Sequence, residues 1–300
     1  MPSTFEANVL SWDHVENAAV AQAREVGALP FVPCHVALLP GSVKGLGTPW
    51  GSVVLPSGVA MPSAVENVGA GAYAVRLGCR STDLPERIDY LEDILEEVSA
   101  DSTVLDIAGG YKLSLGLDLD TDEVWVLTNT FGACDIHREH LQSAQEWNAA
   151  FLSETCDTAH AHIPVAHSPF FEDYIADVEA TQFDHTHVRV SLANAAIAAM
   201  IAFGVPGDPL HVGIESPSNS LKLEEHGGAT HFVARKGAIS AQHGELGIIP
   251  AHMGSTTHIV RGLNGPGSYS SASALALIAD QVDLIEWVAT LAEVTSYVAQ

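Results

Sequence analysis

The stretch Ser52–Leu77, SVVLPSGVAMPSAVENVGAGAYAVRL, decides the fold class of this chain. Its β-branched runs are interrupted by proline and glycine, a pattern typical of short strands joined by tight turns. Gly69 and Gly71 flank an alanine, and small residues at this spacing let a backbone come close to another group. No side chain from Gly69 to Ala74 coordinates a metal or titrates at neutral pH. The stretch therefore predicts strands around a loop that has the shape of a ligand site without its chemistry.

Helical and strand patterns are mixed along the rest of the chain. Apolar spacing and capping residues predict helices within Asp13–Pro30, Asp83–Ala100, Arg138–Phe151 and Val188–Phe203. Strands are expected on both sides of the acidic turn Asp120–Asp122 and within His231–Ala241 and Glu245–Gly262. The segment Asp283–Val298 is expected to be a helix, or a helix that turns into a strand. Without a repeated βαβ rhythm or a low-complexity linker, the pattern predicts an α+β fold in a single large domain, 1–300.

Composition and charge argue against nucleic-acid binding, a membrane span and secretion. With 300 residues, of which 47% are hydrophobic, the chain can bury a large core. A formal net charge of -25 disfavours nucleic acid as a partner, because affinity for phosphates depends on basic side chains. No apolar run is long enough for a membrane span and no signal peptide pattern is present, so a cytoplasmic location is expected. A protein partner and a homo-oligomer both remain open.

Histidines are the most numerous candidates for chemistry. The chain has 15 of them, and the groups with metal-ligand spacing contain His137, His140, His160, His162, His185 and His187. In AHAHIPVAH and DHTH the histidines alternate as they would on a strand. None of the groups completes a signature such as H-E-x-x-H, so solvated or core histidines are the stronger interpretation. The four cysteines form no C-x-x-C pair, which favours reduced thiols.

The order of the segments resembles the RtcB family of RNA ligases. The match begins with LPFVPCHVALLPGSVKGLGTPWGSVVLPSGVAMPSAVENVGAGAYAVRL and continues in family order with GGYKLSLGLDLDTDEVWVLTNT, SPSNSLKLEEHGGATHFVARKGAISA and GELGIIPAHMGSTTHIVRG. The resemblance covers roughly residues 11–298, and an ordered series of this length is more specific than any single motif. It implies an RtcB-like α+β fold with a central pocket that holds two manganese ions. It also implies a tRNA-splicing and RNA-repair ligase that joins a 3'-phosphate to a 5'-hydroxyl and uses GTP to guanylylate a histidine.

This sequence departs from the family at the residues that carry the chemistry. The resemblance matches family metal ligands to Asn67, Ala70, Lys112, Asn129 (Thr128 if the register slips by one residue) and Ser218. It matches the guanylylated histidine to Ala274. Amide, methyl, ammonium and hydroxyl groups do not replace carboxylates, thiolates and imidazoles as ligands of a divalent ion. The resemblance therefore implies a catalytically inactive member, a pseudoenzyme, with no cofactor expected.

Three functional interpretations follow. The first is a pseudoenzyme that uses the fold for binding or assembly. The second is a working RNA ligase that requires Mn and GTP, and the third is a metal-dependent hydrolase built from the histidine groups named above. Under the first interpretation, Lys112 stands at a position that the resemblance matches to a metal ligand. Its positive charge makes it a candidate for binding a phosphate or another small anion.

Overall fold

The structure is a computed structural model, and it describes most of the chain. The described residues are 4–6, 9–11, 15–29, 32, 36–56, 62–65, 67–85, 93, 95–97, 110–132, 140, 142–143, 146, 171–207, 213–218, 220–226, 229–241, 244–249, 256–262, 267–270 and 285–299.

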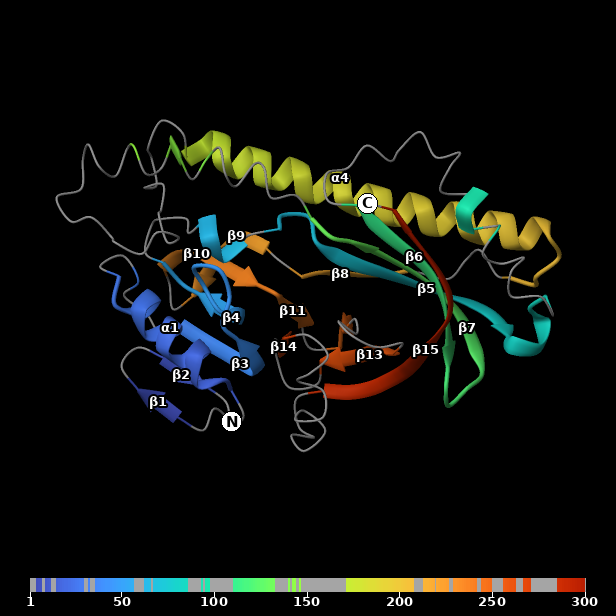
Figure 1. Cartoon of the computed structure of the whole chain (residues 1–300), viewed down its shortest axis with the longest axis horizontal. Helices are drawn as coiled ribbons and strands as arrows, with labels where there is room; N and C mark the ends of the chain where they lie inside the picture. Colours follow the sequence, from blue (N-terminus) through green and yellow to red (C-terminus); the bar gives the residue numbers. More distant parts are fainter. Residues whose placement is uncertain are drawn as a thin grey trace.

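A six-stranded sheet forms one end of the molecule (Figure 1). Its strands, in spatial order, are β1 (Thr4–Glu6), β2 (Val9–Ser11), β3 (Val36–Val43), β4 (Trp50–Val54), β10 (Ala229–Lys236) and β9 (Ser220–His226). Only β2 and β3 run parallel, and helix α1 (Asn17–Gly27) makes the crossover between them. Strands from the start of the chain therefore pair in this sheet with the hairpin of β9 and β10, which begins more than 160 residues after β4.

A seven-stranded antiparallel sheet forms the other end. Its spatial order is β12 (Leu246–Ile249), β13 (Thr256–Gly262), β15 (Ile285–Ala299), β6 (Tyr111–Asp118), β7 (Glu123–Thr130), β5 (Gly71–Arg80) and β8 (Ile214–Pro217). The strands β11 (Ala238–Ala241) and β14 (Gly267–Ser270) pair in a separate two-stranded sheet. Two short 3-10 helices, Pro62–Val65 and Ser81–Asp83, flank the loop and strand around β5.

The seven-stranded sheet curls into a nearly closed barrel. Its two edge strands, β12 and β8, contact each other, and the Ser216 hydroxyl donates to the Ile248 carbonyl at 3.5 Å. We call the face inside this curl the inner face. Side chains from strands on both sides of the seam pack there into one apolar cluster, which contains Ala72, Ala74, Trp125, Leu127, Ile214, Ile248, Ile259, Ala289 and Leu291.

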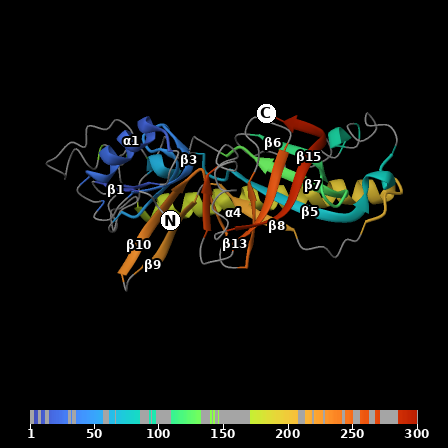
Figure 2. The ribbon, with the colours of Figure 1, turned by 90° about the horizontal axis from the view of Figure 1, so that it is seen from below.

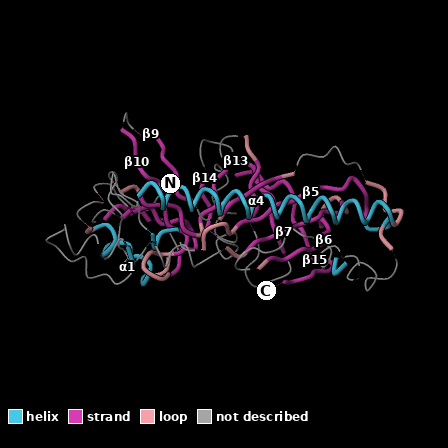
Figure 3. The backbone as a smooth tube through the Cα atoms, turned by 90° about the horizontal axis from the view of Figure 1, so that it is seen from above, coloured by secondary structure: helices cyan, strands magenta, loops and turns pink. Residues whose placement is uncertain are grey.

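Helix α4 (Phe171–Ala202) runs along the long axis of the molecule on the outer side (Figures 1 and 3). Its first turns pack on the six-stranded sheet through Phe171, Tyr174 and Val178. Its second half packs on the outer face of the seven-stranded sheet through residues such as Ala193 and Met200. The view from below shows the two sheets lying one after the other along the helix (Figure 2). Helix α4 therefore ties the two sheets together.

The α+β prediction is confirmed, and so are the strands on both sides of the acidic turn Asp120–Asp122. The prediction of a helix within Asp283–Val298 was wrong, because the described part of the segment, from residue 285, forms β15. Its alanine, leucine and glutamate favour helices locally, but pairing with both β13 and β6 overrides that preference. Helix α1 begins at Asn17 after Glu16 rather than at Asp13, and α4 is longer than expected. Within the described residues, no helix combines the length and apolarity that crossing a bilayer requires.

Candidate functional site

A row of cross-strand neighbours brings the predicted positions together at one end of the inner face. Lys112 on β6 lies opposite Asn129 on β7, Asn129 lies opposite Ala72 on β5, and Ala72 lies opposite Ser216 on β8. Directly opposed residues point to the same side of a sheet. Because Ala72 belongs to the inner cluster, the whole row faces inward. Thr128 faces outward, so only Asn129 shares a face with Lys112.

The loop before β5 adds the remaining positions. Asn67 has a left-handed backbone with φ 61°, a conformation that asparagine tolerates better than most residues. Its carbonyl accepts a hydrogen bond from the Ala70 amide at 3.1 Å. The Ala70 carbonyl in turn accepts one from the Ser218 amide at 2.9 Å. The structure therefore places Asn67, Ala70 and Ser218 beside the row.

Lys112 forms an ion pair across the inner face. Its ammonium donates to the carboxylate of Glu293 on β15, a residue 181 positions away in the sequence. The two side chains are 28% and 29% exposed, so the pair is neither solvated freely nor sealed in the core. The positive charge of Lys112 is thus matched by a carboxylate of the same chain.

We expect the Lys112–Glu293 pair to contribute little to folding. Charge pairs that retain contact with water are typically worth about 1 kcal/mol or less. A double-mutant cycle of Lys112→Met and Glu293→Gln, measured by urea unfolding, should give a coupling energy within that limit. A coupling of about 3 kcal/mol or more would mean that the pair is sealed from solvent and fixes the curvature of the sheet.

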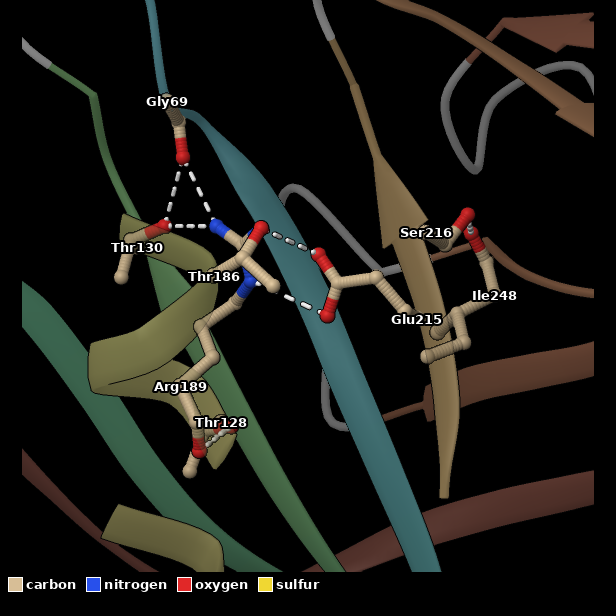
Figure 4. Close-up of polar contacts among 8 residues, drawn as sticks. All are labelled: Gly69, Thr128, Thr130, Thr186, Arg189, Glu215, Ser216 and Ile248. Carbon is tan, nitrogen blue, oxygen red and sulfur yellow. Dashed lines mark hydrogen bonds and ion pairs between the residues drawn. The ribbon is translucent and has the colours of Figure 1, made fainter. Parts of the chain in front are cut away.

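The other side of the Gly69 loop is held by a buried arginine on α4 (Figure 4). Arg189 is 1% exposed, and it donates to the Gly69 carbonyl at 2.8 Å and to the Thr130 hydroxyl. Its second terminal nitrogen donates to the Thr186 hydroxyl at 2.8 Å and pairs with the Glu215 carboxylate. This network joins the helix, the loop before β5, and the ends of β7 and β8, so it positions the backbone of the candidate site.

Gly69 approaches α4 so closely that no side chain fits at its position. A Cβ atom there would lie 2.4 Å from the imidazole ring of His185, and the residue has φ 85°. The prediction of a close approach at this glycine is confirmed. The group that is approached is the ring of His185, whose side chain is buried.

Burial makes the His185 imidazole harder to protonate. Desolvation, with a smaller contribution from the Arg189 charge, lowers the pKa of His185 from 6.5 to about 4. The Nδ1 atom is buried and makes no hydrogen bond within the described structure. The neutral imidazole is therefore the form that the fold accommodates.

We expect this histidine to make stability depend on pH. Because its pKa is lower in the folded state, the unfolded chain binds the proton first, and stability that is complete above pH 6.5 falls as the pH drops toward 4. The loss is about 3 kcal/mol, on the order of the pKa difference converted to free energy. Urea unfolding of the wild type and of His185→Gln at pH 7, 6, 5 and 4 should show a steeper decline for the wild type. Parallel declines would contradict the assignment.

The other described histidines of the predicted metal groups lie apart. His140 pairs with Asp177 at 2.7 Å and contacts the edge of Tyr174. His187 is exposed and stacks on Phe183, on the opposite side of α4 from the buried His185. The strand-like alternation expected for His185 and His187 was wrong, because on a helix two such positions point about 200° apart. His137, His160 and His162 lie outside the described residues, as does Ala274.

The five matched positions carry amide, hydroxyl, methyl and ammonium groups. Across the described ranges, no three histidine, cysteine, aspartate or glutamate side chains gather in a way that holds a metal ion. The side chains brought together at the end of the inner face can donate and accept hydrogen bonds. None of the five matched positions offers the anionic or imidazole ligands that Mn²⁺ binds in proteins.

Sequence reasoning missed Glu293 and Arg189. Glu293 lies in the segment that was expected to be helical, so its strand partner across the sheet was not anticipated. Arg189 is the sole charged residue in the apolar run Val188–Phe203, and a lone charge on an otherwise apolar helix is a signal for a buried network.

A family model and two proteins of known function are similar to this chain, and all three are described as RtcB ligases. A family model described as tRNA-splicing ligase RtcB matches residues 97–274, more than half of the chain. The RNA-splicing ligase RtcB of Escherichia coli strain K12 is 24% identical over 343 aligned residues, which cover 90% of this chain and 81% of that protein. The RNA-splicing ligase RtcB1 of Escherichia coli strain ATCC 25922 is similar to the same extent, with 24% identity and the same coverage.

Proposed function

The chain belongs to the RtcB family of tRNA-splicing ligases, and from this membership we propose that it is a non-catalytic member that uses the family fold for binding or assembly. One observation carries the proposal. The sheet brings together the positions that the resemblance matches to metal ligands, and they are occupied by Asn67, Ala70, Lys112, Asn129 and Ser218. This observation supports a member that keeps the backbone of the site and lacks the metal ligands.

The residues at this site do not fit a pair of manganese ions. Divalent manganese prefers carboxylates, imidazoles and water as ligands, and the matched positions supply none of the protein ligands. The Lys112 ammonium would also lie beside the metals and repel them. Its pairing with Glu293 supports a site in which a fixed cation of the protein replaces a bound one. Fold and function separate in this proposal, because function resides in the site.

Thermal shift with Mn²⁺ and GTP tests the proposal. A ligand that binds only the folded state raises its stability by RT ln(1 + [L]/Kd), so saturating ligand gives a clear rise in Tm. We expect no rise for this protein when the two ligands are added separately or together. The Escherichia coli relative, assayed in parallel, serves as the positive control. A clear rise for this chain would contradict the proposal and favour the ligase alternative, in which it joins RNA ends with GTP and Mn.

A second hypothesis is that Lys112 binds a phosphate or another small anion. A phosphate at this position would have to displace the Glu293 carboxylate, which already satisfies the ammonium. Glu293→Gln removes this competitor while keeping the shape of the side chain. If the site takes an anion, Glu293→Gln should bind inorganic phosphate more tightly than the wild type in a calorimetric titration, and Lys112→Ala should not bind it. Equal signals from all three proteins would exclude the hypothesis.

A further inference from the structure

The outward side of α4 carries an exposed stripe that the fold does not use. Its members recur at intervals of three or four residues and are Ala176, Ala180, Phe183, His187, Val190, Asn194, Ala198 and Ile201. All are exposed except Val190, which is half-buried, and Phe183 and Ile201 are 70% and 39% exposed. A surface helix ordinarily turns a polar face to solvent. Figure 3 views the molecule from this side, with α4 lying across its front.

The spacing of the stripe suits a second helix. From Ala176 to Asn194 the intervals alternate between four and three residues, which is the pattern of a coiled-coil seam. The stripe is also nearly symmetric about its midpoint, between Val188 and Arg189. An identical helix that runs in the opposite direction would place its Asn194 beside Phe183 and its Ile201 beside Ala176. The surface is therefore close to self-complementary, as a two-fold interface requires.

Charge on α4 favours the antiparallel arrangement. Its five carboxylates all precede His185 and are Glu172, Asp173, Asp177, Glu179 and Asp184. From His185 to Ala202 the only charged residue is Arg189, which is buried. A parallel pair would place the five carboxylates beside five identical ones. An antiparallel pair places the acidic half of one helix along the uncharged half of the other.

In the antiparallel pair, the carboxylates of the two helices lie far enough apart for salt to screen their repulsion. About the midpoint of the stripe, Asp184 and its copy are offset by nine residues, which is about 13 Å along the helix axis. This exceeds the Debye length of about 8 Å at physiological ionic strength. In this arrangement the carboxylates of the two α4 helices are therefore largely screened from one another.

We propose that the outer face of α4 is a homodimer interface in which two copies of this chain pack antiparallel about a two-fold axis near His187 and Val190. This inference concerns a surface outside the candidate site, so it holds or fails independently of the proposed loss of catalysis. A single helix pair lies at the small end of protein interfaces. The dimer should therefore dissociate on dilution.

Sedimentation velocity of the full chain over a concentration series tests the interface. We expect a dimer fraction that rises with concentration. Phe183→Glu should weaken dimerisation by about tenfold or more, because it places a charge in the seam. Leu119→Glu is the matched control, since Leu119 is 62% exposed in the turn between β6 and β7 and is not part of α4. A monomer at all concentrations, or an equal effect of the two variants, would overturn the proposal.

Cross-linking tests the orientation. Phe183→Cys combined with Asn194→Cys should form an intermolecular disulfide under mild oxidation, because the antiparallel register places these positions side by side. Phe183→Cys alone should not, since the two copies of position 183 are offset by 11 residues, about 16 Å. Cross-linking by the single variant, or its absence in the double variant, would contradict the antiparallel pair.

Discussion

Replacing Arg189 by methionine is expected to lower the free energy of unfolding by about 3–5 kcal/mol, the typical cost of breaking a buried charge network from one side. The guanidinium is 1% exposed and holds the Gly69 carbonyl, the Thr130 and Thr186 hydroxyls and the Glu215 carboxylate. Methionine fills much of the volume but donates no hydrogen bond. The partners near the loop would then be left buried and unsatisfied. Urea unfolding measures the effect.

The chain offers a matched control for this experiment. Arg261 pairs with Glu286 at 2.7 Å, and the two side chains are 41% and 49% exposed. Because water solvates both groups, Arg261→Met should cost about 1 kcal/mol or less. If the two substitutions cost the same, the network around Arg189 does not organise the site.

Gly132→Ala is expected to be strongly destabilising, because a left-handed backbone and a steric clash coincide at this glycine. Gly132 has φ 82°, and a Cβ there would lie 2.3 Å from the Asn67 carbonyl oxygen and 2.9 Å from the Ala70 nitrogen. These are backbone atoms, so no side-chain rotation relieves the clash. Left-handed strain of about 1–2 kcal/mol adds to a steric cost of about 1–3 kcal/mol. We therefore expect a loss of about 2–5 kcal/mol in urea unfolding.

Gly244→Ala separates the cost of the left-handed backbone from the cost of the steric clash. Gly244 has φ 80°, almost the same as Gly132, but a Cβ there meets nothing within 4 Å. It should lose only the conformational part, about 1–2 kcal/mol. Equal losses at the two positions would mean that the Asn67–Ala70 loop moves away freely, and the loop would then not be a fixed part of the site.

Local signals in the sequence account for the parts of the fold that were predicted correctly. The strands β6 and β7 are rich in apolar and β-branched residues on both sides of an acidic turn, in which Asp118 accepts hydrogen bonds from the Thr121 hydroxyl and the Asp120 amide. Gly69 marks a close approach that the structure confirms. These features depend on residues near one another in the chain, where pattern and turn chemistry are informative.

The parts that were missed depend on distant residues. The strand β15 is specified by partners on both sides rather than by its own composition. Arg189 and the Gly69 carbonyl are 120 residues apart, and Lys112 and Glu293 are 181 apart. The lone charge of Arg189 indicates a buried network, but a single sequence does not identify the distant partner in such a pair. For Asn67, Lys112, Asn129 and Ser218, the guide was the register that the family resemblance supplied, not a local pattern.

The measurement that tests the central claim most directly is intact-protein mass spectrometry after incubation of the untagged chain with Mn²⁺ and GTP, alongside metal analysis of protein purified without chelator. The Escherichia coli relative, treated identically, controls for the reaction conditions. A non-catalytic member should show neither a covalent guanylate nor stoichiometric metal. A guanylylated residue together with bound manganese would contradict the account and establish the chain as a working ligase.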